Sequence, residues 1–204
     1  MIAMVDYGVG NLFSLEQSFH AIHADVSVTA DADVLRRADK ILLPGVGAFG
    51  DAAEKLRSTG LGEVVVAEAN KGKPLLGICL GMQLLFEEGY EYGFHKGLGL
   101  ISGRIKPISD VIPQGLKIPH MGWNSLKFTR DSRLFANIHD GEYVYFVHSY
   151  YATDCDADTI ATAEYGVPLT AAVEKGNVFG CQFHPEKSGA AGLAILKAFC
   201  EMKV

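Results

Sequence analysis

The sequence has few cysteines, and their spacing predicts neither a zinc site nor a redox pair. Four of the 204 residues are cysteines, at positions 79, 155, 181 and 200. No two of them have the Cys-x-x-Cys spacing that is typical of zinc ligands and thioredoxin-like motifs. Cysteines without a disulfide framework are usual in a reducing compartment, so we expect a cytoplasmic protein that needs no metal.

Long apolar runs and an excess of positive charge are also missing. No run approaches the ~20 apolar residues that a membrane-spanning helix needs. The apolar stretch Met1–Val5 ends at Asp6, which is too short for a signal-peptide core. A formal net charge of −6 disfavours binding to nucleic acid or to anionic membranes. Residues 6–11 have too few glycines for a dinucleotide fingerprint, so no cofactor is expected.

The pattern of apolar residues predicts a single α/β domain over residues 1–204. Short apolar runs alternate with helical periodicity in the first half, which is typical of a parallel sheet covered on both faces. After about residue 95 strand-like runs dominate, and they predict an antiparallel or mixed extension of the sheet. We therefore expect three layers, with a mostly parallel central sheet between two layers of helices. The predicted strands are 2–5, 26–29, 40–43, 74–78, 104–108, 143–147, 159–164, 169–174 and 178–183, and the predicted helices are 11–22, 52–57, 62–70, 82–88 and 190–202.

One cysteine lies between two glycines where a predicted strand meets a predicted helix. The stretch is Gly77-Ile78-Cys79-Leu80-Gly81. This is the context of a nucleophile elbow, in which a strained turn presents the nucleophile at the start of a helix. The helix N-terminus offers unpaired N–H groups and positive potential, which favour a thiolate and an oxyanion. The alternative is a buried structural cysteine, as free cysteines often are.

A base and an acid that could serve this thiol lie far downstream, in Phe183-His184-Pro185-Glu186. His184 and Glu186 are two residues apart at the end of a strand-like run, so both side chains could project to one side. One imidazole nitrogen could then take the thiol proton while the other donates to the carboxylate. Taken alone, the motif is a weak signal, and a turn at a strand end with a half-exposed histidine is then the better interpretation.

The loop Pro44-Gly45-Val46-Gly47 follows a predicted strand and precedes a helix. A glycine-rich loop of this kind can direct a backbone N–H at a developing oxyanion, and such a donor is worth on the order of 3 kcal/mol. A plain strand-to-helix turn explains the same pattern equally well.

Together, Gly77-Ile78-Cys79-Leu80-Gly81-Met82-Gln83 and His184-Pro185-Glu186 resemble the motifs of the class I (triad) glutamine amidotransferases, over essentially the whole chain. Within that class, four segments resemble the glutaminase subunits of imidazole glycerol phosphate synthase, from histidine biosynthesis. These segments are residues 6–12, 44–49, 120–124 and 145–151.

The resemblance implies a role for each matching residue. Cys79 would attack the glutamine side-chain amide, His184 would act as acid and base, and Glu186 would orient His184. The N–H groups of Leu80 and of the loop at Val46 and Gly47 would hold the oxyanion. Gly47, Gln83, Ser149 and Tyr150 would bind the amino-acid end of glutamine. The implied partner is a cyclase subunit with a (β/α)8 barrel that receives the ammonia, and the matching interface or passage residues are Asn11, Met121, Trp123, Tyr145 and Lys187.

Other interpretations are open at this level. The chain could be a glutaminase for another ammonia-using synthase, a free-standing thiol hydrolase, or a non-catalytic regulatory module. Residues 120–124 argue against another synthase, and an intact set of Cys79, His184 and Glu186 argues against a non-catalytic module. Trp123, the only tryptophan, could anchor an interface or pack in the core.

Overall fold

A computed structural model describes residues 1–203 and is built around an eight-stranded sheet. The five strands at one side of this sheet are parallel to one another, and the other three run antiparallel to their neighbours. In spatial order the strands are β2 (Val26–Thr29), β1 (Ile2–Val5), β3 (Lys40–Leu43), β4 (Leu75–Ile78), β14 (Val178–Cys181), β13 (Pro168–Lys175), β12 (Thr159–Glu164) and β9 (Lys127–Phe128).

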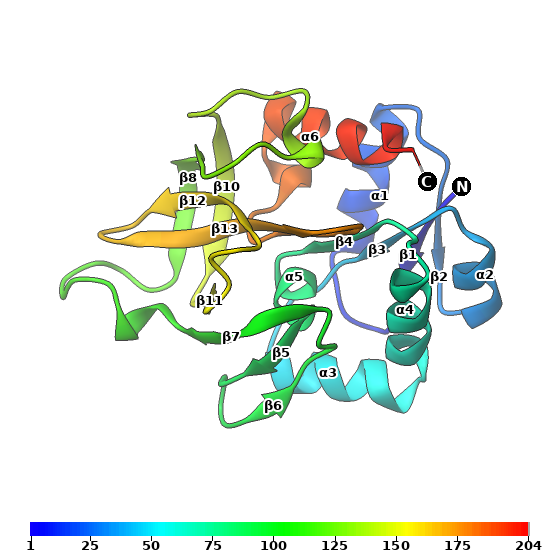
Figure 1. The fold of residues 1–204 in the computed structure, drawn as a ribbon, viewed down its shortest axis with the longest axis horizontal. Helices are drawn as coiled ribbons and strands as arrows, with labels where there is room; N and C mark the ends of the chain where they lie inside the picture. The colour runs from blue at the N-terminus through cyan, green and yellow to red at the C-terminus, as the bar shows by residue number, and fades with distance from the viewer. Residues whose placement is uncertain (204) are drawn as a thin grey trace.

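Helices cover both faces of the large sheet, as predicted (Figure 1). The side chains of β1 alternate accordingly, because successive residues of a strand point to opposite faces. Ile2 and Met4 belong to the apolar core beneath the first and last helices of the chain, whereas Ala3 and Val5 belong to the core on the opposite face of the sheet. The helices are α1 (Leu12–Ala21), α2 (Ala32–Arg37), α3 (Phe49–Ser58), α4 (Leu61–Asn70), α5 (Leu80–Leu84) and α6 (Gly189–Glu201). None of the helices in residues 1–203 is both long enough and apolar enough to cross a membrane.

Two small sheets lie beside the large one, which differs from the single extension that the sequence predicts. Only β13, β12 and β9 extend the large sheet in antiparallel fashion. The runs at 104–108 and 143–147 instead belong to separate sheets. One contains β11 (Tyr150–Thr153), β7 (Ile101–Pro107), β5 (Phe86–Gly89) and β6 (His95–Lys96), and the other pairs β8 (His120–Ser125) with β10 (Tyr143–His148).

The predicted helix over residues 82–88 is wrong in its second half. The helix α5 ends at Leu84, and β5 begins at Phe86. The carbonyls of Leu84 and Leu85 accept hydrogen bonds from the N–H groups of Leu98 and Leu100 rather than from a further helical turn. Pairing with a distant segment therefore overrides the local helical pattern. The sequence analysis also missed α2 and β8.

Candidate functional site

Cys79 lies in a sharp turn between β4 and α5, which confirms the predicted strand–turn–helix arrangement. Its backbone has φ 54° and ψ −112°, a conformation that side-chain-bearing residues rarely adopt outside functional sites. The Cys79 N–H donates to the carbonyl oxygen of Cys181 on the adjacent strand at 2.7 Å. The turn is thereby tied to β14, and the thiol is presented at the N-terminus of α5.

The glycines that flank Cys79 are required by close backbone packing. A Cβ at Gly81 would lie 1.8 Å from the carbonyl oxygen of Leu43, and one at Gly77 would lie 2.7 Å from the carbonyl oxygen of Gly81. In both cases the obstacle is backbone rather than a flexible side chain. The elbow can therefore form only with glycine at these two positions.

We expect Gly81→Ala to destabilise the protein by about 3 kcal/mol or more, because the new methyl group must displace the backbone of Leu43. Urea unfolding measures this loss. The matched control is Gly176→Ala, where a Cβ meets no atom within 4 Å and only the φ of +61° is unfavourable; the expected loss there is about 1 kcal/mol. Equal losses for the two variants would contradict the packing argument.

His184 and Glu186 are close together, but not through the strand alternation that the sequence suggests. The strand β14 ends at Cys181, and Pro185 begins a 3-10 turn, Pro185–Lys187, that carries Glu186 back towards His184. The Nδ1 atom of His184 donates to Glu186 Oε1 at 2.8 Å, and both side chains are buried. The geometry that the strand pattern predicts is wrong in detail, although the pairing of the two side chains is present.

The backbone of His184 is held from two sides. Its N–H donates to the carbonyl oxygen of Tyr145 on β10 at 2.9 Å. Its carbonyl accepts from Ser188 Oγ at 2.6 Å, and that hydroxyl in turn accepts from the Tyr145 N–H at 3.0 Å. The strand β10 therefore fixes where the imidazole lies. Ser188 is a positioning residue that the sequence analysis did not identify.

Burial alone would lower the pKa of His184, but its interactions with Cys79 and with Glu186 outweigh burial and raise the pKa to about 10. At neutral pH the imidazole therefore carries a proton. A protonated Nδ1 donates to Glu186, which leaves the Nε2 side of the ring for a second partner. The arrangement thus offers a general acid.

We expect Glu186→Gln to lower the pKa of His184, because a neutral amide stabilises the imidazolium less than a carboxylate does. The folded-state pKa of about 10 exceeds the ordinary value of 6.5. The stabilisation is therefore fully present below pH 6.5 and is lost as the pH rises through 10. Urea unfolding should show the largest difference between wild type and variant near pH 6 and a smaller one at pH 10. A difference that does not change with pH would contradict this charge assignment.

One cavity of about 320 Å³ brings together most of the predicted site residues. Cys79 and His184 both line this cavity, which is partly open to solvent. The predicted oxyanion and substrate residues Val46, Gly47, Leu80, Gln83, Ser149 and Tyr150 line it as well. Asn11 lies outside, beside a small adjoining space that His184 and Glu186 also line. Met121, Trp123, Tyr145 and Lys187 line neither space.

The glycine-rich loop between β3 and α3 is anchored at both ends. The hydroxyl of Tyr7 donates to the carbonyl oxygen of Pro44 at 2.8 Å, and the Phe49 N–H donates to Glu91 Oε2 at 2.7 Å. Burial raises the pKa of Tyr7, so its hydroxyl keeps the proton that it donates. Between these anchors Gly47 has a φ of +94°, with open space around it. The loop therefore has fixed ends and a free centre next to Cys79.

The structure adds site residues that the sequence analysis missed. Glu91 brings a carboxylate to the cavity from the turn after β5, and no motif marks it. Gln182 is fully buried, with its amide nitrogen 4.0 Å from Cys79 Sγ. Its Oε1 accepts from Gln83 Nε2 at 2.9 Å. The Gln83 amide nitrogen therefore donates to groups of the protein itself. The amide oxygen of Gln83 is the atom that can bind a ligand.

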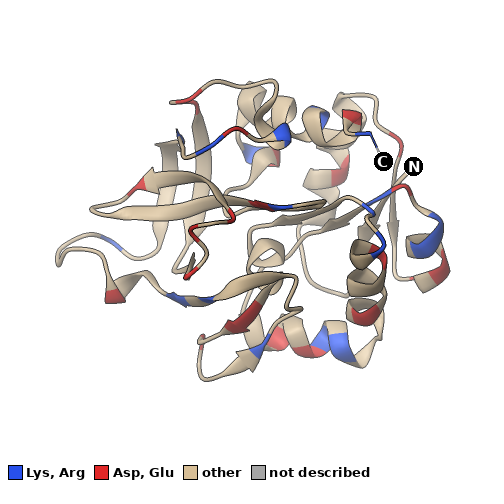
Figure 2. Ribbon diagram, in the orientation of Figure 1, with Lys and Arg blue, Asp and Glu red and all other residues tan. Residues whose placement is uncertain are grey.

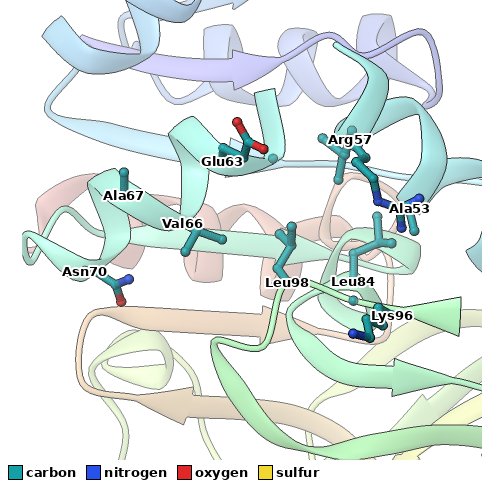
Figure 3. Close-up of a pocket in the computed structure, with 12 residues that line it drawn as sticks. Ala53, Arg57, Glu63, Val66, Ala67, Asn70, Leu84, Lys96 and Leu98 are labelled. Carbon is teal, nitrogen blue, oxygen red and sulfur yellow. The ribbon is translucent and has the colours of Figure 1, made fainter. Parts of the chain in front are cut away.

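A larger cavity, of about 590 Å³, lies between α3, α4 and the segment after β6 (Figure 3). The residues that line it include the apolar Leu84 and Leu98 and the charged Arg57, Glu63 and Lys96 (Figure 3). Its lining contains no cysteine, histidine, serine or threonine, so it offers no thiol or hydroxyl nucleophile and no imidazole base. Within residues 1–203, no three His, Cys, Asp or Glu side chains are grouped so that they could hold a metal ion. The Cys79 cavity is therefore the candidate catalytic site.

Comparisons with known proteins identify the family of this chain. Residues 3–202 match the family described as glutamine amidotransferase class-I. The chain is 52% identical over 202 residues to imidazole glycerol phosphate synthase subunit HisH of Bacillus licheniformis, covering 98% of this chain and 95% of that protein. It is 50% identical over 202 residues to the HisH subunit of Methanothermobacter thermautotrophicus, covering 99% and 98%.

A solved structure has a similar fold at low sequence identity. PurLQS from Thermotoga maritima superposes with a TM-score of 0.76 and 21% identity, covering 97% of this chain and 96% of that chain. This likeness concerns the fold alone. The family match and the two full-length relatives settle the assignment: the chain belongs to the class-I glutamine amidotransferases, among the HisH subunits of imidazole glycerol phosphate synthase.

Proposed function

We propose that this chain is the glutaminase subunit of an imidazole glycerol phosphate synthase and supplies ammonia for histidine biosynthesis. It hydrolyses glutamine to glutamate and ammonia and passes the ammonia to a cyclase subunit. The observation that carries the proposal is Cys79 in its strained turn, facing the same cavity as His184, which Glu186 orients. Two HisH relatives at about half identity over nearly the full length support the pathway.

The reaction proceeds by acyl transfer to sulfur. His184 takes the proton of the Cys79 thiol, the sulfur attacks the side-chain carbonyl carbon of glutamine, and the protonated imidazole gives that proton to the departing ammonia. A water molecule then attacks the thioester while His184 removes a proton from it. That proton returns to the sulfur as glutamate is released, which restores the starting state of Cys79 and His184. Glu186 keeps the imidazole in one orientation through the 2.8 Å hydrogen bond.

The oxyanion of both tetrahedral intermediates lies at the N-terminus of α5. Leu80 is the first residue of that helix, so its N–H has no partner within the helix and can donate to the oxyanion. The loop at Val46 and Gly47 lines the same cavity and supplies a second donor. Open space around Gly47 permits the peptide to turn its N–H inward.

The α-ammonium and α-carboxylate groups of glutamine need polar partners in the cavity wall. Gly47, Gln83, Ser149 and Tyr150 bring backbone groups, an amide and hydroxyls to the cavity wall. Glu91 adds the negative charge that an α-ammonium group requires, and the Phe49 N–H already fixes one of its oxygens. Charge-assisted hydrogen bonds of this kind are stronger than neutral ones and orient a zwitterionic substrate.

The cyclase docks on the outer face of the β8–β10 ribbon. Neither strand contains Lys, Arg, Asp or Glu, and both are tan in Figure 2. Met121 is 61% exposed and Trp123 is 56% exposed, which contradicts a core role for the tryptophan. Trp123 packs edge-on against Tyr145 with ring centroids 6.2 Å apart, and Lys187 Nζ lies 5.8 Å from the centroid of that tyrosine ring. Exposed aromatic side chains with a nearby cation are typical of interface anchors.

A glutamine analogue that carries an electrophilic ketone in place of the amide tests the substrate class. The purified chain is incubated with the analogue and its modification is located by peptide mass spectrometry. We expect one adduct, on Cys79, that excess glutamine suppresses and excess asparagine does not. Modification that is spread over Cys155, Cys181 and Cys200, or that glutamine does not suppress, would contradict the proposed site.

A further inference from the structure

The β8–β10 ribbon has an exposed outer face, which carries Met121 and Trp123, and a buried inner face. The register pairs Met121 with Val147 and Trp123 with Tyr145, while His120 pairs with His148. Because side chains alternate along a strand, the two histidines point to the side opposite Trp123. Both are buried, with exposed fractions of 3% and 6%. His148 also lines the Cys79 cavity. The inner face therefore reaches the candidate active site.

The two histidines form a chain of hydrogen bonds that ends at the Tyr150 carbonyl. Because this carbonyl can only accept, it determines which ring nitrogen donates at each step. His148 Nδ1 lies 2.8 Å from the carbonyl oxygen of Tyr150, which can only accept, so Nδ1 carries the hydrogen. Burial lowers the pKa of both imidazoles to about 4, so both are neutral at physiological pH. His148 Nε2 therefore accepts from His120 Nδ1 at 2.9 Å. His120 Nε2 in turn accepts from the Asn124 amide at 3.2 Å.

The chain ends on a carbonyl that belongs to the substrate cavity. The Tyr150 oxygen also accepts from Gln83 Nε2 at 3.1 Å, so two donors hold it in place. Ser149, Tyr150 and Gln83 all line the cavity in which glutamine is proposed to bind. A change in the orientation of His148 would release one of the two donors and let this segment shift.

The ring of His120 is itself held firmly. It stacks on Phe146 with centroids 4.7 Å apart and on Tyr165 with centroids 4.3 Å apart. The ring plane is therefore set by packing, and the position of its Nδ1–H follows from it. His120 is thus a rigid donor at the start of the path towards Tyr150.

We propose that His120 is a positioning residue for glutamine hydrolysis, which acts through His148 to fix the Tyr150 carbonyl and links this edge of the substrate cavity to the exposed face of β8 around Trp123. The inference rests on the proposed function. His120 itself does not line the Cys79 cavity; its effect is on the geometry with which glutamine is held.

Two substitutions at His120 separate donation from packing. His120→Phe keeps a stacked ring and removes the donor, whereas His120→Asn restores an amide donor near the position of Nδ1 and loses the ring. In the complex with the cyclase and its nucleotide ligand, we expect His120→Phe to raise KM for glutamine about tenfold, as for the loss of one buried hydrogen bond. We expect His120→Asn to stay within about threefold of wild type. Alkylation of Cys79 by iodoacetamide should be unchanged in both.

The opposite order, with His120→Phe normal and His120→Asn impaired, would assign the residue to packing and overturn the proposal. If His120→Phe does not fold, Asn124→Ala tests the other end of the chain, where an unchanged KM would also overturn it. Failure of the wild-type complex to release glutamate would instead contradict the proposed function itself.

A double-mutant cycle tests the link to the outer face. His120→Phe, Trp123→Ala and the double variant are compared at saturating cyclase, with the stimulation of glutamate release as the readout. If the two residues act along one path, the double variant should lose clearly less than the product of the two single losses. Losses that multiply would contradict the link.

Discussion

Replacing Cys79 by alanine is expected to abolish glutamine hydrolysis while the protein stays folded. No other group in the Cys79 cavity offers a sulfur nucleophile, and removal of a nucleophile from a comparable catalytic set lowers kcat by roughly 10⁶-fold. The thiol is buried and small, so its loss leaves little space to fill. We therefore expect an unchanged near-ultraviolet spectrum and at most about 1–2 kcal/mol less stability by urea unfolding.

Cys155→Ala is the matched control for this experiment. Cys155 is also buried, but its sulfur lies near the hydroxyls of Thr159 and Thr170, outside the Cys79 cavity. This variant should lose a similar amount of stability and keep its glutaminase activity. Retained hydrolysis in Cys79→Ala, measured as glutamate release in the complex with the cyclase, would refute the nucleophile assignment.

Replacing Trp123 by alanine is expected to weaken binding of the cyclase about 30-fold or more. Trp123 is 56% exposed, and its ring packs against Tyr145 on an uncharged ribbon. Aromatic anchors of this kind contribute about 2 kcal/mol or more to binding. An exposed side chain contributes little to the core, so the melting temperature should change by only a few degrees.

Phe94→Ala is a control with matched exposure. Phe94 is 55% exposed and lies in the segment between β5 and β6. Figure 1 shows these two strands away from the β8–β10 ribbon. Calorimetric titration with the cyclase should give a wild-type Kd for this variant. If Trp123→Ala binds normally, or if both variants bind equally weakly, the assignment of the docking face is wrong.

The first half of the fold could be predicted because its strands and helices are determined by patterns of neighbouring residues. Residues 2–5 and 40–43 are short apolar runs bounded by polar or turn residues, and both form strands with the predicted bounds. The side chain of Asn11 accepts from the Ser14 N–H at the start of α1, where the sequence places a helix start. In each case the pattern of neighbouring residues decides the structure.

The second half depends on partners that are distant in the sequence. Phe86–Gly89 resembles a helical continuation, yet it pairs with β7, and the Glu91 that follows it enters the cavity. His120 and Asn124 belong to a segment that resembles the family, but their contacts with each other and with His148 appear only when β10 places His148 opposite His120. Local residue patterns cannot supply such contacts, because the register of two strands that are distant in the sequence is a tertiary property.

Release of glutamate from glutamine, measured for the chain alone and with a cyclase subunit and its nucleotide ligand, tests the account most directly. The account predicts a large increase in glutamate release on addition of the loaded cyclase, and complete loss of that release in Cys79→Ala. Equal release with and without the cyclase would contradict the proposed partnership, and release that survives Cys79→Ala would contradict the proposed chemistry.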